Sequence, residues 1–260
     1  MKKISIITIN FNNYNGLVQT TKSVINQDFR DFEYIIIDGG SNDGSKEYIS
    51  SINENVDYWV SEPDNGIYNA LNKGIEKATG EYLLFLNSGD YFINNKVLSE
   101  NETCFNNFDL IYFDIFMGNT LKRTKISYPN FLNFNLFYQA TICHQAIFFK
   151  NELFSKYGNY NEQLKFISDW EFLIKTIFIH QVSYKHINDS IVLYDDSGYS
   201  SNSSNYSLMQ DERNKVLREI LPGFIEDYTD YNIKSNFIKK FKLNFFMQMF
   251  LKFKKAIKKH

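Results

Sequence analysis

The sequence is poor in proline and cysteine, which number 3 and 2 among its 260 residues, whereas phenylalanine and tyrosine number 25 and 18. With 43% hydrophobic residues the chain has enough material for a core, which excludes a disordered chain. The length suits one large α/β domain, or a domain with a small appendage. The two cysteines, Cys104 and Cys143, lack the spacing of metal ligands. A reduced, cytosolic protein is therefore the simpler interpretation, and a disulfide between the two is the alternative.

Long hydrophobic runs are also missing. The apolar run behind Lys2 and Lys3 covers only Ile4–Ile9 and is interrupted by Ser5 and Thr8. A run of this length is too short for the core of a signal peptide. No segment approaches the roughly 18–20 apolar residues of a membrane span. We therefore predict a cytoplasmic protein without a signal peptide or a transmembrane helix.

Acidic residues are absent from the end of the chain, and this absence hides a charge asymmetry. Residues 231–260 contain nine lysines and no arginine, aspartate or glutamate, although the net charge of the whole chain is only −2. Residues 1–230 consequently carry 19 basic and 30 acidic side chains, a net charge of −11. So acidic a body argues against nucleic acid as its partner. It can bind a nucleoside diphosphate if a metal ion offsets the phosphate charge.

Four short apolar segments each run into small, polar or acidic residues. They are Ile4–Ile9 into Asn10-Phe11-Asn12, Tyr34–Ile37 into Asp38-Gly39-Gly40-Ser41, Tyr58–Val60 into Ser61-Glu62-Pro63-Asp64, and Tyr82–Leu86 into Asn87-Ser88-Gly89-Asp90. If these segments are strands of one parallel sheet, their polar ends meet at its carboxyl edge, where open α/β sheets bind nucleotides. The pattern predicts a nucleotide site with a place for a divalent cation.

Residues 1–90 alternate between strand and helix patterns, which predicts a parallel sheet with crossover helices. The clearest helix is Ile67–Thr79. Near residue 110 the pattern changes to a hairpin of Leu110–Phe116 and Leu121–Ser127. We take residues 1–110 as a nucleotide-sugar half and 111–205 as an acceptor half of one domain.

Later in the chain we predict a strand at Ala146–Phe149, a helix at Asp169–Ile179, and strands at Val182–His186 and Ile191–Tyr194. The polar segment Asp195–Asn205 is a loop, either a surface linker or a lid over the site. Residues 206–260 form a separate C-terminal segment, helical and basic.

The polar strand ends and several later motifs resemble family 2 glycosyltransferases of the GT-A fold. The matching segments are Asp38-Gly-Gly-Ser-Asn-Asp-Gly-Ser, Asp64-Asn-Gly-Ile-Tyr-Asn-Ala-Leu-Asn-Lys-Gly, Ala78-Thr-Gly-Glu-Tyr, Leu86-Asn-Ser-Gly-Asp, His144-Gln-Ala-Ile-Phe-Phe and Ser168-Asp-Trp-Glu-Phe. They appear in the family's order and cover roughly residues 3 to 200. The chain departs from the family at Ser88, which stands where the Asp-X-Asp metal motif has its first acid.

The resemblance implies a Rossmann-like GT-A fold, in which a mostly parallel sheet with flanking helices carries a smaller antiparallel part. It assigns Asp90 to a Mn²⁺ or Mg²⁺ ion, and Asp38 to the N3–H of a pyrimidine base, which favours uridine. Asn10, Asn87 and Ser88 join the donor site. Asp64 helps to form the nucleoside pocket, or caps the helix at Ile67 instead.

On the acceptor side the resemblance assigns the catalytic base to Asp169. A carboxylate there faces the anomeric carbon opposite the departing diphosphate, so that direct displacement inverts the anomeric configuration. Glu171 lies two residues further on and should point elsewhere on a helix. His144 is either a structural histidine or a contact to the diphosphate or the acceptor.

The last 28 residues have a pattern of their own. Apolar residues recur every four positions from Phe237 to Ile257, and lysines fill the other faces of Ile233–His260. This pattern predicts a basic amphipathic helix, which suits an anionic membrane surface on the cytoplasmic side. A helix packed on its own domain or on a partner subunit is the alternative.

These observations together predict an inverting, metal-dependent glycosyltransferase. It would move a sugar, a hexose or an N-acetylhexosamine, from a uridine diphosphate donor to an oligosaccharide, a lipid-linked precursor of a surface polysaccharide. A sugar-nucleotide nucleotidyltransferase is one alternative, although no basic, glycine-rich triphosphate loop follows the first strand. A nucleotide-binding module that has lost activity is another, because of Ser88. A dinucleotide-dependent oxidoreductase is disfavoured, since no G-x-G-x-x-G follows that strand.

Overall fold

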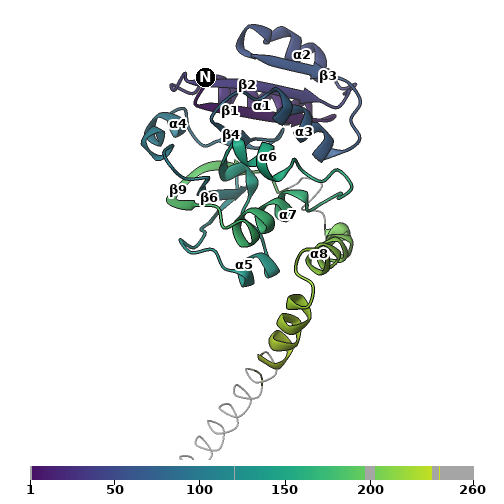
Figure 1. Ribbon diagram of the computed structural model, residues 1–260. Helices are drawn as coiled ribbons and strands as arrows, with labels where there is room; N and C mark the ends of the chain where they lie inside the picture. Colours follow the sequence, from purple (N-terminus) through teal and green to yellow (C-terminus); the bar gives the residue numbers. More distant parts are fainter. Residues whose placement is uncertain (1, 120, 197–202, 236–239, 241–260) are drawn as a thin grey trace, which may run out of the picture. The chain divides into compact units, whose positions relative to one another are not determined.

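The structure of the chain is a computed structural model that describes residues 2–119, 121–196, 203–235 and 240 (Figure 1). The chain divides into two compact units, Met1–Met209 and Gln210–His260. The larger unit is built on one mixed β-sheet, whose strands follow the order β3-β2-β1-β4-β8-β6-β9-β5, with β7 paired to β6.

The first 90 residues alternate strands and helices, as the sequence predicts. The elements are β1 (Ile4–Asn10), α1 (Tyr14–Ile25), β2 (Phe32–Asp38), α2 (Ser45–Ser51), β3 (Tyr58–Ser61), α3 (Ile67–Lys77) and β4 (Tyr82–Phe85). Strands β3, β2, β1 and β4 are parallel to one another. Their carboxyl ends therefore lie at a single edge of the sheet.

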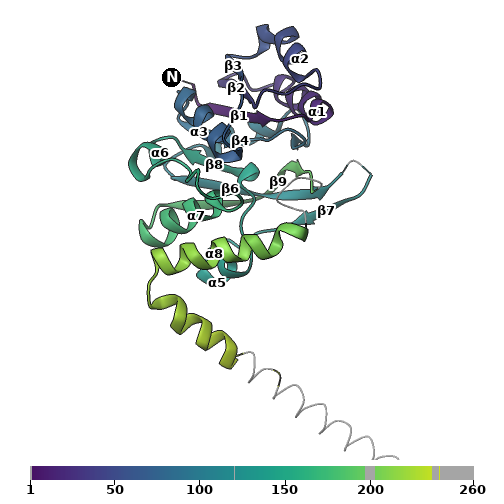
Figure 2. The same ribbon diagram turned by 90° about the vertical axis from the view of Figure 1, so that its right-hand side faces the viewer.

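The rest of the larger unit is mostly antiparallel. The elements are β5 (Tyr91–Phe92), α4 (Val97–Glu100), β6 (Leu110–Gly118), β7 (Arg123–Ile126), α5 (Phe134–Gln139), β8 (Ile147–Lys150), α6 (Glu152–Tyr157), α7 (Ser168–Ile174) and β9 (Tyr184–Tyr194). Strand β8 is antiparallel to both β4 and β6 and so joins the two halves of the sheet. The predicted hairpin is β6 with β7, which extends from the sheet (Figure 2).

Two details differ from the predicted elements. One strand, β9, replaces the two predicted between Val182 and Tyr194, and it runs parallel to β6 with register shifts beside Asp114. Helix α7 ends at Ile174 and continues as a π-helical turn over Lys175–Ile179. A bulge in a strand and a widened last turn are local backbone features that a period of apolar residues does not encode.

The parallel half holds together because its helices pack apolar side chains onto strands whose residues are mostly buried, except in β3. Helix α1 begins after Asn13, whose side chain accepts a hydrogen bond from the Gly16 amide at 3.1 Å. Helix α3 packs on β1 and β2. It approaches β1 so closely that a Cβ atom on Gly74 would lie 2.4 Å from Cγ2 of Ile7. Glycine is therefore required there by space.

A cluster of aromatic rings connects residues 1–110 to residues 111–205. Phe85 at the end of β4 contacts Phe149 on β8, with ring centroids 5.8 Å apart. Phe154 on α6 stacks on Phe172 of α7 at 4.6 Å, and Tyr160 lies against both Phe85 and Phe172. Aromatic pairs of this kind add to the apolar area that they bury. The cluster fixes α7, which carries Asp169, to the strand end that carries Asn87.

In the smaller unit the described residues are helical. Helix α8 (Tyr206–Ile220) continues into it, and a second helical stretch covers residues 224–235 (Figure 2). Most of the predicted basic amphipathic helix over Ile233–His260 lies outside the described residues. Within the part of the chain that is described, no helix has the length and apolar character needed to cross a membrane.

Candidate active site

The carboxyl edge of the parallel strands joins three of the predicted donor-binding residues in one hydrogen-bonded row. Asn10 at the end of β1 lies beside Asp38 at the end of β2, and its Nδ2 donates to Asp38 Oδ1 at 2.7 Å. The hydroxyl of Ser88, after β4, donates to Asn10 Oδ1 at 2.8 Å. The sequence prediction that these strand ends converge is consistent with this arrangement.

Asp38 has no accepting capacity left in this arrangement. Its carboxylate is fully buried and accepts from Asn10 Nδ2, the Ser41 hydroxyl, the Ser41 amide and the Ser61 hydroxyl, at 2.6–3.0 Å. Burial acts to raise the pKa of Asp38, yet these donors outweigh burial and hold it below its usual range. A carboxylate offers about four lone-pair sites, and all four are used here. The role predicted for Asp38, accepting the N3–H of a base, would require one of these donors to turn away.

A second carboxylate, that of Asp64, lies at the same edge. Asp64 Oδ1 pairs with Lys73 Nζ at 2.6 Å, whereas its Oδ2 points towards Gly39. A Cβ atom on Gly39 would lie 3.1 Å from Asp64 Oδ2 and 3.2 Å from the ring of Phe11. Phe11 is 67% exposed. Because Gly39 has no side chain, the Phe11 ring and the Asp64 carboxylate both approach its backbone closely.

The alternative role of Asp64, as the cap of α3, is not seen. Helix α3 begins after Gly66 without a hydrogen bond from a capping side chain. Asp64 instead forms an ion pair with Lys73, which lies on α3 and also pairs with Glu62 at 2.7 Å. The Asp64 side chain is thereby held at the strand edge.

Asp90 is a buried carboxylate with accepting capacity to spare. It is 4% exposed, and it accepts from Gln145 Nε2 and from the Asp195 amide, both at 2.9 Å. Burial raises the pKa of Asp90 to about 7, although both hydrogen bonds act to lower it. Two of its four lone-pair sites stay open. A nearby cation would stabilise the charged form of such a buried carboxylate.

Asp195 is a residue that the sequence analysis did not assign to the site. It follows β9, and its carboxylate lies beside Gly89, in the turn that carries Asp90. A Cβ atom on Gly89, whose φ is +107°, would lie 3.1 Å from Asp195 Oδ2. The charge of Asp195 also acts to raise the pKa of Asp90. A second acid is therefore present near Asp90, although Ser88 replaces the acid of the family's motif.

These two carboxylates, Asp90 and Asp195, fit a divalent cation that keeps phosphate oxygens and water as its other ligands. Mg²⁺ is commonly held by one or two protein carboxylates together with substrate phosphates. Among the described residues, no group of three or more histidine, cysteine, aspartate or glutamate side chains could hold a metal ion. The donor set therefore fits a cation that arrives with a nucleotide better than a resident one.

The acceptor-side residues form a second row. Asp169, in the first turn of α7, accepts from the Tyr68 hydroxyl at 2.8 Å and from His144 Nδ1 at 3.0 Å. Burial acts to raise the pKa of Asp169, but His144, Tyr68 and the Trp170 amide outweigh burial and lower it. On the other side of the ring, His144 Nε2 lies 3.4 Å from Asn87 Nδ2. His144 therefore links the predicted base to the end of β4.

Helix α3 supports this row from the donor half, which the sequence analysis did not foresee. Besides Tyr68, its Asn69 and Asn72 donate to Glu162 at 3.0 and 2.8 Å, and Asn72 also donates to the Tyr160 carbonyl at 2.9 Å. The motif from Asp64 to Gly74 thus ties the loop before α7 to the nucleotide edge. In the sequence, the only sign of these contacts was that α3 carries polar side chains.

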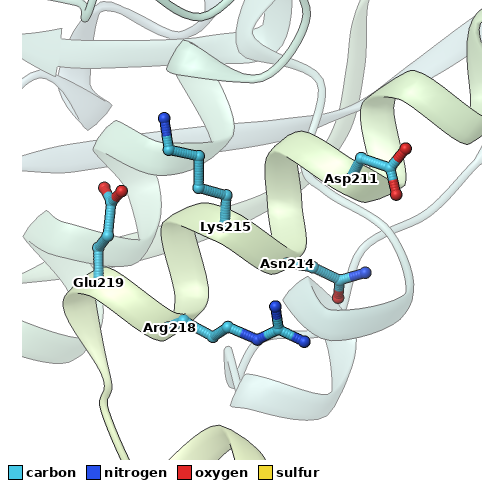
Figure 3. Close-up of a pocket in the computed structure, with 5 residues that line it drawn as sticks. All are labelled: Asp211, Asn214, Lys215, Arg218 and Glu219. Carbon is cyan, nitrogen blue, oxygen red and sulfur yellow. The ribbon is translucent and has the colours of Figure 1, made fainter.

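Glu171 and a hollow on α8 lie outside the candidate site. Glu171 is 6% exposed and pairs with Lys175 at 2.7 Å on its own helix, so it points elsewhere, as predicted. A hollow of about 470 Å³ lies on α8 (Figure 3). It is lined by Asp211, Asn214, Lys215, Arg218 and Glu219. These polar and charged side chains come from a single helix, and none of them belongs to the predicted site.

Comparisons with known proteins identify the family of the chain. The family model described as glycosyl transferase family 2 matches residues 5–158. An uncharacterized glycosyltransferase of Mycobacterium tuberculosis is 35% identical over 181 residues, covering 68% of this chain and 69% of the relative. A PGL/p-HBAD biosynthesis glycosyltransferase of Mycobacterium bovis is 30% identical over 191 residues, covering 70% of this chain and 72% of the relative.

Solved structures share the fold. Residues 1–349 of Staphylococcus aureus TarS, crystallised with UDP-GlcNAc, align with a TM-score of 0.65 at 19% identity, covering 85% of this chain and 67% of that one. The mannosyltransferase PcManGT of Pyrobaculum calidifontis, with GDP-Man and Mn²⁺, aligns with a TM-score of 0.60 at 15% identity, covering 83% and 61%. The predicted GT-A, Rossmann-like fold is confirmed. The family model covers more than half of the chain, and the chain belongs to glycosyl transferase family 2.

Proposed function

We propose that the protein is an inverting, metal-dependent glycosyltransferase that uses a uridine diphosphate sugar. One observation carries this proposal. The buried Asp90, with Asp195 beside it, and the Asp169–His144 pair both adjoin Asn87 after β4: the Asp90 amide donates to the Asn87 carbonyl, and His144 faces the Asn87 side chain. A diphosphate bound at the first group places the anomeric carbon of the sugar towards the second, which is the arrangement that in-line displacement requires.

The side chains beside Gly39 support a uridine donor. The exposed ring of Phe11 offers a stacking face, and Asp64 Oδ2 is an acceptor for the N3–H of uracil. TarS was crystallised with UDP and with UDP-GlcNAc, whereas PcManGT was crystallised with GDP-Man, so the shared fold serves both bases. Asn10, Ser88 and Asp38 form the wall of this donor site.

The leaving diphosphate needs its charge neutralised. Mn²⁺ or Mg²⁺ bound with the donor would supply this by stabilising the negative charge that develops on the phosphate. Asp90 and Asp195 would hold that ion. Asn87, at the same strand end, is placed to contact the phosphate or the sugar.

The acceptor hydroxyl loses its proton as it attacks, and the Asp169–His144 pair receives it. Attack from this side, opposite the diphosphate, inverts the anomeric configuration. Relatives of the chain are named for PGL/p-HBAD biosynthesis. We propose an oligosaccharide acceptor carried on a lipid at the cytoplasmic face of the membrane, with the basic tail as the contact to that surface.

A ligand screen tests the donor proposal directly. Melting temperatures are measured for the full chain with UDP, GDP, CDP or ADP, each with Mn²⁺ and each with EDTA. UDP with Mn²⁺ should raise the melting temperature most, because a ligand that binds the folded state stabilises it by mass action. Release of UDP from UDP-GlcNAc, UDP-glucose and UDP-galactose is then followed with and without Mn²⁺. An equal response to UDP and GDP would remove the uridine assignment, and no response to any nucleotide would remove the function.

A further inference from the structure

One short turn of the chain contacts both carboxylates on which the proposed function depends. His144 and Gln145 are neighbours in the 3₁₀ turn His144–Ala146, which leads into β8. His144 Nδ1 lies 3.0 Å from the carboxylate of Asp169, and Gln145 Nε2 donates to Asp90 Oδ2 at 2.9 Å. Two adjacent side chains thereby connect the proposed cation site to the proposed base.

We infer that Gln145 is a positioning residue for the cation site. It holds the Asp90 carboxylate in the orientation in which Asp90 and Asp195 bind the Mn²⁺ or Mg²⁺ ion that arrives with the donor. The inference rests on the proposed function and adds to it a residue that does not touch the ion. Side chains that hold a metal ligand in this way commonly change the affinity for the metal by about 10- to 100-fold.

The Asp90 side chain is held at both of its carboxylate oxygens. Gln145 donates to Oδ2, and the Asp195 amide donates to Oδ1 at 2.9 Å. Each oxygen therefore keeps one lone pair, and the direction of both lone pairs is fixed. The main chain of Asp90 is held as well, because the Thr20 hydroxyl donates to its carbonyl at 2.7 Å.

The amide of Gln145 can face Asp90 in one way only. Its Oε1 accepts a hydrogen bond from the Cys143 thiol at 2.8 Å, and its Nε2 donates to Asp90. If the amide turned over, its oxygen would meet a carboxylate oxygen. Burial raises the pKa of the Cys143 thiol, so the thiol keeps its proton near neutral pH and remains a donor. The Cys143 amide donates to the Tyr128 hydroxyl at 3.1 Å, which anchors the turn.

Both contacts of the Gln145 amide are made inside the protein, because Gln145 is buried. An apolar residue of the same length would leave Asp90 Oδ2 without this donor and the Cys143 thiol without its acceptor. With one donor fewer, the Asp90 carboxylate is free to turn. It then has to be reoriented when the cation binds, which weakens the binding.

The test compares Gln145→Met with a matched variant, Gln27→Met, in the full chain. Methionine has nearly the length of glutamine but cannot donate a hydrogen bond. Isothermal titration of Mn²⁺ into each protein with saturating UDP gives the dissociation constant for Mn²⁺. Gln145→Met should raise that constant by about 10- to 100-fold. UDP affinity in EDTA should stay within about threefold of wild type, because the cation is then absent from both proteins.

Gln27 is the matched control because it is a buried glutamine just after α1, towards the amino ends of the parallel strands. Its Nε2 donates to the Ser23 and Asn94 carbonyls at 3.1 and 2.7 Å, and its Oε1 accepts from the Leu98 amide at 3.2 Å. Gln27→Met should therefore lower the melting temperature at least as much as Gln145→Met does. Its Mn²⁺ constant should stay within about threefold of wild type.

A second measurement separates the affinity for the cation from the rate. UDP release from UDP-GlcNAc, UDP-glucose and UDP-galactose is followed as the Mn²⁺ concentration is raised. Gln145→Met should need at least about tenfold more Mn²⁺ to reach half of its maximal rate, whereas the maximal rate itself should stay within about fivefold of wild type. Cys143→Ser keeps a donor to Gln145 and should bind Mn²⁺ as wild type does, whereas Cys143→Ala should bind it at least about threefold more weakly.

Gln145→Asn keeps the test decisive if Gln145→Met does not fold. Asparagine retains the amide but is shorter by one C–C bond of about 1.5 Å, so it cannot keep the contact with Asp90. The same weakening of Mn²⁺ binding is expected.

Three results would overturn the inference. They are a Mn²⁺ constant raised by less than about tenfold in the folded Gln145 variant, an equal rise in Gln27→Met, or a loss of UDP affinity in EDTA that matches the loss of Mn²⁺ affinity. Unchanged Mn²⁺ binding in Cys143→Ala would overturn the role of the thiol. Failure of the proposed function differs, since wild type would then bind no Mn²⁺ with UDP and release UDP from none of the three sugars.

Discussion

Three aspartates at the site differ mainly in how many donors surround each carboxylate. Asp38 receives four hydrogen bonds, Asp169 three and Asp90 two. A carboxylate with four donors is a fixed part of the fold, whereas one with two donors can still bind a cation. Residue type alone therefore does not assign the role. The number of donors depends on neighbours from other strands.

Asp38→Asn tests the structural role of the saturated carboxylate. The amide replaces an accepting oxygen with a donor that faces other donors, so the free energy of unfolding should fall by about 2–4 kcal/mol at pH 7. The pKa of Asp38 is lowered in the folded state, so its ionised form stabilises the fold above the ordinary carboxyl range. That contribution disappears as the pH falls through the lowered value. Urea denaturation from pH 7 to pH 3 should show the two proteins converge.

The exposed Asp31→Asn provides the control for Asp38→Asn, and its stability should change by less than about 0.5 kcal/mol. UDP affinity is measured on both variants. A large loss of UDP affinity in Asp38→Asn without any loss of stability would return Asp38 to the role of base recognition.

The cation site makes a prediction for a pair of carboxylates. Asp90→Asn and Asp195→Asn should each abolish most of the Mn²⁺-dependent part of UDP binding, because a cation held by two protein ligands loses half of them. Asp196→Asn is the matched control, since Asp196 is the exposed neighbour of Asp195. Isothermal titration of Mn²⁺ into each protein with UDP measures the effect. If Asp195→Asn binds Mn²⁺ as tightly as wild type does, Asp195 is not a ligand of the cation, and Asp90 is its one proposed protein ligand.

At the scale of elements, the sequence predicted which residues lie at the strand ends, but it did not predict which distant side chains contact them. Alternating apolar segments that end in Asn10, Asp38 and Asn87 predict a shared edge, because parallel strands have their carboxyl ends on one side. The contacts of Asp90 come from Gln145 and Asp195, which are 55 and 105 residues away. Such contacts depend on how β8 and β9 pair across the sheet. No local pattern of residues encodes that pairing.

Helix α3 must lie close to β1 for Tyr68 to reach Asp169, and Gly74 sets that approach. Gly74→Ala should lower the free energy of unfolding by roughly 1–3 kcal/mol, the scale for an overpacked core, because the new methyl group meets Ile7. Ile7→Ala removes the opposing Cγ2 atom, so the double variant should be more stable than the sum of the two changes predicts. Urea denaturation of the four proteins gives the coupling energy. Additive effects would show that Gly74 is not held by contact with Ile7.

At the scale of the whole molecule, charge is divided along the chain. Residues 1–230 carry a net charge of −11, and the last 30 residues carry nine lysines without an acid. An anionic membrane would repel the first part and attract the second. An enzyme whose acceptor is attached to a lipid would thereby be brought to the surface that carries its substrate. Lysine residues near an anionic surface contribute about 1 kcal/mol each, and salt screens this attraction.

Truncation after Tyr231 tests whether the tail binds a membrane. The truncated protein should no longer float with vesicles that contain anionic lipid, and its UDP release should stay near wild type, because every proposed site residue lies before residue 200. A full chain with its nine tail lysines changed to glutamine should also lose vesicle binding. In contrast, a tail that packs on its own domain would leave apolar surface exposed on truncation, and the melting temperature would fall without any lipid present. Flotation and melting curves on both variants separate the two, and a stable truncated protein that still binds vesicles would contradict both.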